Sequence, residues 1–183
     1  IRKLVELAGS PYFQAFLANS GSEANENAIK LARALTGRKE IVSLTGSFHG
    51  RTYGALSATG IAKYRAYLNT PVPDHRIVEA EVAAESVSEE TAALLVEPIQ
   101  SLGGVRVIPP EWLAQMASAC RNHGSLLIFD EVQLGLGRTG RFLYSGINGT
   151  YPDMVTLAKG IASGIPASAI LVTEDLAKSV KSG

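Results

Sequence analysis

The chain has 183 residues with 17 basic and 17 acidic side chains, so its formal net charge at neutral pH is +0. This balance, without a basic stripe, excludes nucleic acid and anionic membrane surfaces as expected partners. The apolar runs are far shorter than the roughly 20 residues of a membrane span. The single cysteine, Cys120, excludes an internal disulfide framework and favours a reducing, cytoplasmic location, with Cys120 as a small core residue.

Helical and strand patterns alternate along the chain. Helices are predicted over residues 2–8, 23–35 and 110–123 and from 174 onward, and strands over 12–18, 40–44, 76–79, 92–97, 126–130, 154–158 and 168–173. Gly37 ends the helix 23–35. Pro109 and Pro110 mark the start of the helix 110–123, and Gly124 marks its end. The glycine-rich segment 135–149 is predicted to be irregular.

Strands that are apolar throughout and separated by helices predict an α/β fold, with a mostly parallel sheet flanked by helices. In such sheets ligands bind beyond the carboxyl ends of the strands. Polar motifs follow these ends at 19–22, 46–51, 97–100, 130–133 and Lys159. We therefore expect the motifs to meet at one edge of the sheet.

Lys159 and Asp130 come at the ends of two apolar strand patterns, and Gly160 follows the lysine. A lysine that caps a strand and an aspartate that forms a turn are the simpler interpretations. However, a nucleophilic lysine needs partial burial, which lowers its pKa. A lysine and a carboxylate at neighbouring strand ends suit pyridoxal phosphate (PLP), which needs a Schiff-base lysine and a carboxylate beside its ring nitrogen.

Two further segments supply the other parts of such a site. Backbone N–H groups at Gly21 and Ser22, with the Ser22 hydroxyl, predict a phosphate cup at a helix start, although ordinary helix capping would use the same groups. Phe48 and His49 lie between Gly46 and Gly50 in a loop that can lay one flat ring over another. Burial in the core is the alternative for Phe48, and a structural role is the alternative for His49.

Five motifs, taken together and in order, resemble the class III (ω-amino-acid type, fold type I) PLP-dependent aminotransferases, and within them the acetylornithine, ornithine and 4-aminobutyrate branch. The motifs lie at 19–25, 47–52, 96–100, 129–133 and 157–160. The resemblance implies that residues 1–183 form an aspartate-aminotransferase-like, PLP-binding large domain. It also implies that the N-terminal segment and the C-terminal small domain of the family lie outside this sequence, and that the family's homodimer is the working form.

The resemblance implies a role for each candidate site residue. Lys159 forms the Schiff base and moves a proton, and Asp130 pairs with the ring nitrogen. Gly21 and Ser22 hold the phosphate, Phe48 and Val132 cover the two ring faces, Gln133 contacts the phenolic oxygen, and Glu97 lies beside the ring. His49 contacts cofactor or substrate, and Arg51 holds a substrate carboxylate. An ordinary surface arginine is the alternative for Arg51.

The implied reaction moves an amino group from an amine or ω-amino acid to a 2-oxo acid, with 2-oxoglutarate as the acceptor. A PLP-dependent aminomutase or racemase of the same fold and a catalytically inactive, truncated scaffold remain alternatives. An ATPase is excluded because the sequence has no Gly-Lys dipeptide. A dinucleotide enzyme is equally unsupported, because no Gly-x-Gly-x-x-Gly opens a helix after a strand.

The sequence departs from the family's pattern at Leu102. The likened branch has a glutamate after Pro-Ile-Gln that pairs with a late arginine and uncovers it for an α-carboxylate. Leu102 cannot accept a hydrogen bond, so this switch is absent as usually built. We expect either that the arginine is replaced, which favours donors without an α-carboxylate, or that it stays open to solvent, which favours simple α-amino acids. The sequence leaves the amino donor itself open.

Overall fold

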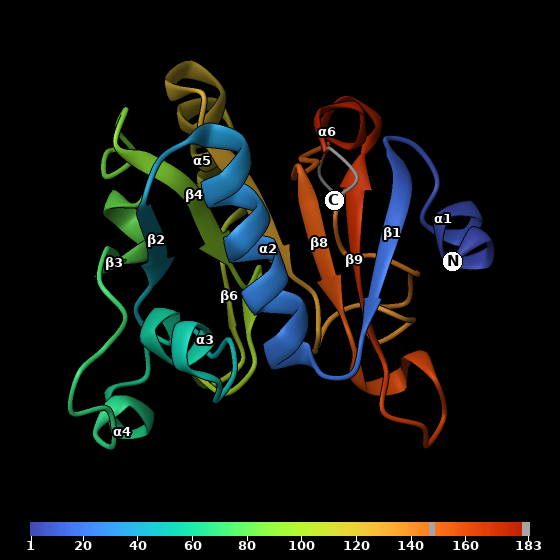
Figure 1. Cartoon of the computed structure of the whole chain (residues 1–183), viewed down its shortest axis with the longest axis horizontal. Helices are drawn as coiled ribbons and strands as arrows, with labels where there is room; N and C mark the ends of the chain where they lie inside the picture. Colours follow the sequence, from blue (N-terminus) through green and yellow to red (C-terminus); the bar gives the residue numbers. More distant parts are fainter. Residues whose placement is uncertain (147–148, 181–183) are drawn as a thin grey trace.

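A seven-stranded sheet forms the centre of the computed structural model, which describes residues 1–146 and 149–180. Residues 147 and 148 of the segment predicted to be irregular lie outside the described residues. Figure 1 shows the sheet from the face that α2 covers, with β3 at its left edge and β1 at its right edge. The strands follow the order β1 (Tyr12–Ala18), β9 (Ser168–Thr173), β8 (Met154–Leu157), β7 (Leu126–Asp130), β4 (Thr91–Val96), β2 (Glu40–Leu44) and β3 (His75–Val78).

The sheet is mostly parallel, which confirms the predicted α/β class. The pairs from β8 across to β3 are parallel, and β9 is antiparallel to both β1 and β8. The cause is the connection between β8 and β9. The short segment 158–167 carries only the 3-10 turn η2 (Lys159–Ile161), and a parallel pair needs a longer crossover, usually with a helix.

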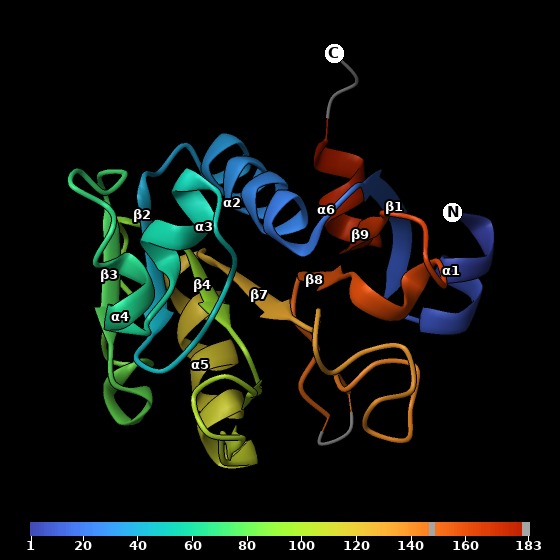
Figure 2. The ribbon, with the colours of Figure 1, turned by 90° about the horizontal axis from the view of Figure 1, so that it is seen from below.

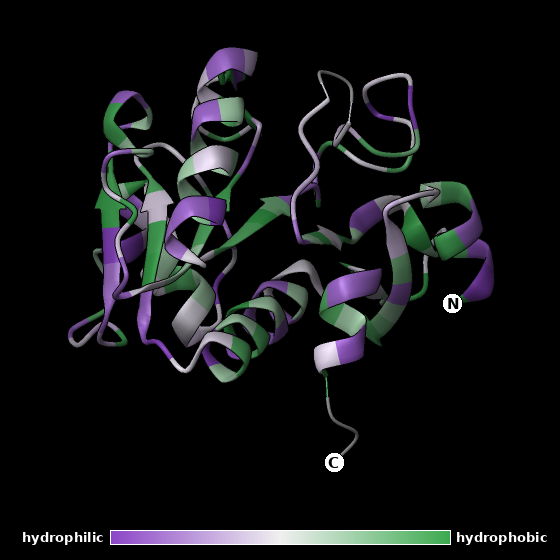
Figure 3. Ribbon diagram, turned by 90° about the horizontal axis from the view of Figure 1, so that it is seen from above, coloured by the Kyte–Doolittle hydropathy of each residue, from purple (hydrophilic) through white to green (hydrophobic). Residues whose placement is uncertain are grey.

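Helices cover both faces of the sheet (Figure 2). Helix α2 (Gly21–Thr36) packs with Ala93 and Leu95 of β4 in one core cluster. Helix α5 (Pro110–His123) packs with Leu94 and Val96 in another, and Cys120 lies in that cluster as expected. Successive side chains of a strand point to opposite faces, so a continuously apolar strand joins both clusters. Figure 3 shows these hydrophobic strands in green and the outer helix faces largely in purple.

Smaller elements surround the sheet. Helices α1 (Arg2–Ala8) and α6 (Glu174–Ser179) contact β1, and the latter also contacts β9. The sequence did not predict five short elements: helices α3 (Tyr53–Ala58) and α4 (Ala62–Arg65), strands β5 (Ile99–Gln100) and β6 (Arg106–Val107), which form a hairpin, and the 3-10 turn η1 (Ala80–Val82). Such short elements carry too few residues for a periodic pattern.

The start of α2 differs from the prediction by two residues, and the difference bears on the site. The predicted helix begins at residue 23, whereas the observed helix begins at Gly21. Ser20 is the N-cap, and its Oγ accepts a hydrogen bond from the Glu23 amide at 3.2 Å. Gly21 and Ser22 therefore belong to the first helical turn, whose N–H groups have no acceptor within the helix.

Across residues 1–146 and 149–180, no helix is both long and apolar enough to pass through a bilayer.

Candidate active site

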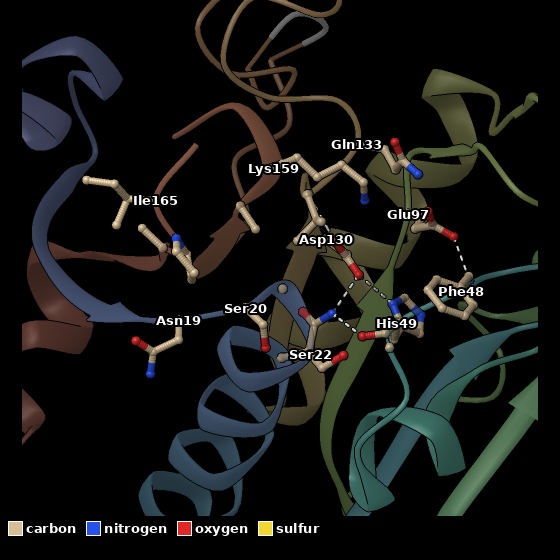
Figure 4. A pocket seen from close by; sticks show the side chains of 17 residues that line it. Asn19, Ser20, Ser22, Phe48, His49, Glu97, Asp130, Gln133, Lys159 and Ile165 are labelled. Carbon is tan, nitrogen blue, oxygen red and sulfur yellow. Dashed lines mark hydrogen bonds and ion pairs between the residues drawn. The ribbon is translucent and has the colours of Figure 1, made fainter. Parts of the chain in front are cut away.

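A cavity of about 300 Å³ opens at the carboxyl-end edge of the sheet (Figure 4). Nine of the ten predicted site residues line it: Gly21, Ser22, Phe48, His49, Glu97, Asp130, Val132, Gln133 and Lys159. They come from the start of α2, the loop after β2, and the ends of β4, β7 and β8. The tertiary structure thus brings together motifs that are far apart in the sequence.

Asp130 ends β7 and is buried, with its side chain 3% exposed. Its Oδ2 accepts from Asn25 Nδ2 at 2.7 Å and lies 2.9 Å from His49 Nδ1, while its Oδ1 accepts from the Val132 amide at 3.1 Å. An ionised carboxylate only accepts hydrogen bonds, so His49 Nδ1 is the donor in that pair. Three donors thus satisfy both oxygens of this buried carboxyl group. The arrangement holds a fixed negative charge at the floor of the cavity.

Lys159 lies in η2, directly after β8, with a backbone φ of 50°. This left-handed region is uncommon for residues other than glycine, and such conformations cluster at functional sites. The side chain extends toward Asp130 and Glu97 (Figure 4). Partial burial lowers the pKa of Lys159, and the charge of Asp130, with that of Glu97 when it is ionised, opposes that shift. A lowered pKa increases the fraction of the nucleophilic, neutral amine.

Glu97 follows β4 and is 2% exposed. Its Oε2 accepts from the Phe48 amide at 2.6 Å, so it holds the loop 46–51 over the cavity. Burial raises the pKa of Glu97 to about 8, the Asp130 charge adds to this rise, and the Phe48 N–H and Lys159 oppose it. Glu97 is therefore mostly protonated near neutral pH, beside an anionic Asp130.

The start of α2 lies against Val132 and against the loop 46–51. A Cβ atom added at Gly21 would lie 2.9 Å from Val132 Cγ1, so only glycine permits this approach. Ser22 Oγ accepts from the Arg51 amide at 3.1 Å, and a Cβ at Gly50 would collide with Ser22. The helix start, which offers backbone N–H groups to an anion, thus closes one side of the cavity.

Phe48 and Gln133 both line the cavity, and Phe48 also packs outside it. The Phe48 ring meets Tyr64 edge to face, with 5.2 Å between ring centroids and 69° between planes. Gln133 lies near the Lys159 side of the cavity (Figure 4). Phe48 and Gln133 therefore line the cavity from two different segments, the loop 46–51 and the residues after β7.

Arg51 is the one predicted site residue outside the cavity lining. It is exposed, and its guanidinium carbon lies 5.3 Å from the centroid of the Tyr64 ring. Its role toward a substrate carboxylate stays a prediction. His49 is buried beneath the cavity, and its Nε2 has no hydrogen-bond partner among the described residues.

Asn25 and Thr156 belong to the site, although sequence reasoning assigned neither of them a role. Asn25 is 1% exposed and Thr156 is 0% exposed. Asn25 occupies the buried face of α2, where the other buried residues are alanines and an isoleucine. A polar residue in such a position needs a hydrogen-bond partner, and this requirement is the signal that could have identified it. Ile165, Pro166 and Ala167 also line the cavity and were missed.

The aminotransferase class-III model matches residues 1–183. This chain belongs to that family. It is 40% identical over 185 residues to acetylornithine aminotransferase of Methanopyrus kandleri, covering 100% of this chain and 48% of the relative. It is 45% identical over 168 residues to a putative [LysW]-aminoadipate semialdehyde/glutamate semialdehyde transaminase of Pyrococcus furiosus, covering 90% and 46% of the two chains.

Solved structures show the same fold. A Bacillus anthracis aminotransferase superimposes with a TM-score of 0.90 and 31% identity, covering 99% of this chain and 47% of that one. Taurine:2-oxoglutarate aminotransferase from Bifidobacterium kashiwanohense, solved with PLP and glutamate, has a TM-score of 0.88 and 30% identity, covering 97% and 46%. The chain thus spans about half the length of the relatives that it matches.

Proposed function

We propose that this chain is the PLP-binding large domain of a class III aminotransferase, which moves an amino group from an amine or ω-amino acid to a 2-oxo acid. The observation that carries the proposal is the arrangement of one cavity. A lysine with a lowered pKa, a buried carboxylate with three donors and a helix N-terminus all line it. These groups suit the aldehyde, the ring nitrogen and the phosphate of PLP.

The residues that line the cavity offer a contact for each part of the cofactor. Gly21 and Ser22 would hold the phosphate, and Asp130 would keep the ring nitrogen protonated. Val132 and Phe48 would cover the ring faces, and Gln133 would contact the phenolic oxygen. When bound, PLP supplies an electron sink that makes a proton on the substrate's α-carbon removable.

The chain's own residues carry out the proton chemistry. Once the substrate has displaced it, Lys159 would take the proton from the substrate α-carbon and deliver it to the C4′ carbon of the cofactor, and its lowered pKa increases the fraction of neutral amine that can do so. Asp130 is held in place as an anion. Glu97, mostly protonated, adds little negative charge beside it.

Names of relatives support the substrate classes. Several relatives at 40–45% identity are acetylornithine aminotransferases, which favours an ω-amino donor of that type. The acceptor proposed here is 2-oxoglutarate, in line with the taurine:2-oxoglutarate enzyme and its bound glutamate. We further propose that the enzyme acts as a homodimer, as the family resemblance implies, in a reducing cytoplasm where the buried thiol of Cys120 stays free.

Borohydride trapping on the complete natural protein tests the cofactor assignment. PLP should give a yellow protein, and borohydride reduction followed by peptide mapping should place the trapped cofactor on Lys159. Lys159→Ala should abolish the trapped product while the protein stays folded, whereas Lys39→Ala, an exposed lysine, should leave it unchanged. A trapped product on Lys30 or Lys63 would contradict the assignment.

A single-turnover assay tests the reaction class. With acetylornithine or ornithine as donor, the amino group should appear on 2-oxoglutarate as glutamate, which separates a transaminase from an aminomutase or racemase. Asp130→Asn should retain PLP yet lose orders of magnitude in rate, because a neutral amide does not hold the ring nitrogen protonated. Near-normal turnover of this variant would show that Asp130 serves only as a turn residue.

A further inference from the structure

Asn25 makes three hydrogen bonds that join four separate segments of the chain. Its Nδ2 donates to Asp130 Oδ2 of β7 and to the His49 carbonyl of the loop 46–51, both at 2.7 Å. Its Oδ1 accepts from Thr156 Oγ1 of β8 at 2.8 Å. Asn25 itself lies one turn into α2, the helix whose first turn faces the cavity.

The groups around Asn25 fix the orientation of its amide, and Thr156 holds its oxygen. Asp130 and Thr156 are register partners in the β7–β8 pair, so their side chains point to the same face of the sheet, toward α2. A flipped amide would place Oδ1 against two acceptors, the Asp130 carboxylate and the His49 carbonyl. These two acceptors therefore select the orientation in which Asn25 donates to Asp130, and the Thr156 hydroxyl donates to the Oδ1 that this orientation leaves facing it.

The network also ties together the two ends of the proposed cofactor site. The first turn of α2 is the proposed phosphate cup, and Asp130 is the proposed partner of the ring nitrogen. Asn25 connects the two directly, and every polar atom of its side chain has a partner. A fully bonded, buried polar network allows one arrangement only, since each alternative leaves a buried group without a partner.

We propose that Asn25 is a positioning residue that, held by the hydrogen bond from Thr156, fixes the Asp130 carboxylate where it meets the ring nitrogen of the cofactor. This inference rests on the proposed PLP site. It predicts that loss of Asn25 weakens one contact of the cofactor, the contact at the ring nitrogen, and leaves the phosphate contacts in place.

Two cofactors separate this role from a general structural one. The dissociation constant of the complete apo-protein is measured for PLP and for a carbocyclic analogue in which CH replaces the ring nitrogen. Asn25→Ala should weaken PLP by about tenfold or more, the loss expected when a hydrogen bond to a charged group is removed. Binding of the analogue should change by less than about threefold, because the analogue has no nitrogen for Asp130 to hold.

Matched variants complete the test. Thr156→Val keeps the side-chain shape and removes the donor to Asn25, so it should show the same selective loss to a smaller extent, while Thr156→Ser should bind both cofactors like the wild type. Asn27→Ala is the control, because among the described residues Asn27 Nδ2 bonds only the Glu23 carbonyl of its own helix. If Asn25→Ala does not fold, the two Thr156 variants decide the question.

The outcomes distinguish the two proposals. Equal weakening of PLP and the analogue in Asn25→Ala or Thr156→Val would overturn the positioning role, and so would unchanged PLP binding. A wild-type protein that binds neither cofactor would instead overturn the proposed function.

Discussion

Two carboxyl groups in the cavity have different surroundings. Asp130 accepts hydrogen bonds from three donors, which belong to Asn25, His49 and the Val132 amide. Burial and the nearby charge of Asp130 raise the pKa of Glu97 to about 8. Nearby carboxyl groups whose environments separate their protonation states are typical of sites that hold and move protons.

Glu97→Gln should remove a pH-dependent loss of stability. The pKa of Glu97 is about 8 in the folded chain and about 4.3 in an unfolded chain. Between these values the folded form holds a proton that the unfolded form has released, so wild-type stability falls as pH rises through this window. The glutamine does not titrate and can still accept from the Phe48 amide. Relative to the wild type, the variant should therefore gain stability from about pH 5 to about pH 8.

Urea unfolding of the complete apo-protein across that pH range measures this difference. Glu89→Gln, at an exposed position, is the control and should follow the wild-type curve. Parallel curves for Glu97→Gln and the wild type would show that Glu97 is already ionised throughout the window.

At the scale of elements, α2 organises the cavity by holding the loop after β2 along one helix face. Ser22 accepts from the Arg51 amide, and Asn25 donates to the His49 carbonyl. Glu26 Oε1 accepts from the Thr52 hydroxyl and from the amides of Gly54 and Ala55. Ser22 lies one helical turn before the adjacent residues Asn25 and Glu26, so one side of α2 fixes both the loop and the start of α3.

Glu26→Ala should destabilise the protein and loosen the loop 46–54. The carboxylate caps the N–H groups at the start of α3, whose N-cap Thr52 makes no side-chain cap hydrogen bond of its own. Loss of a cap and of a charged acceptor should cost about 1–3 kcal/mol of unfolding free energy. Denaturant unfolding measures the cost, and hydrogen exchange should rise at 53–55 first.

Glu85→Ala, an exposed position with no side-chain hydrogen bond among the described residues, is the matched control for Glu26→Ala and should be close to neutral. Unchanged exchange at the start of α3 in Glu26→Ala would mean that the loop is held by the neighbouring contacts alone.

For the whole molecule, the cavity lies at an edge built from segments spread over most of the chain. Its residues run from Asn19 to Ala167, and the chain itself spans about half the length of its relatives. The turn that follows β5 lies beside this edge, since a Cβ at Gly103 would lie 2.5 Å from the Gly46 carbonyl oxygen. Leu102, in that turn, is 48% exposed and does not line the cavity in the part of the chain described.

Leu102→Glu should shift the donor preference of the complete enzyme. In the likened branch a glutamate here covers a late arginine, and leucine cannot do so. Restoring the carboxylate should raise the ratio of ω-amine to α-amino-acid turnover, because an uncovered arginine favours an α-carboxylate. A panel of donors with 2-oxoglutarate measures the ratio.

Val105→Glu, an exposed position in the same hairpin, adds the same charge as Leu102→Glu and is the matched control. Position 102 does not govern donor choice if Leu102→Glu and Val105→Glu give the same ratio.

The sequence by itself determined the fold class, most strand positions and the anchors of the proposed site. Apolar runs separated by helical patterns identified all seven strands of the main sheet to within a residue or so, and the resemblance of five motifs indicated the family. These features are local, since strand length, helix caps and motif spacing depend on neighbouring residues. Asp130 and Lys159 were found for this reason, because Asp130 is the last residue of β7 and Lys159 follows shortly after β8.

Only the tertiary structure decided how those anchors are held. Asn25 is 105 residues from Asp130 and 131 residues from Thr156 along the chain, so no local pattern links them. The reversed direction of β9, the protonation of Glu97 and the position of Arg51 outside the cavity lining likewise depend on packing. Hydrogen-bond partners and burial are set by which distant segments meet, and burial is what raises the pKa of Glu97 and lowers that of Lys159.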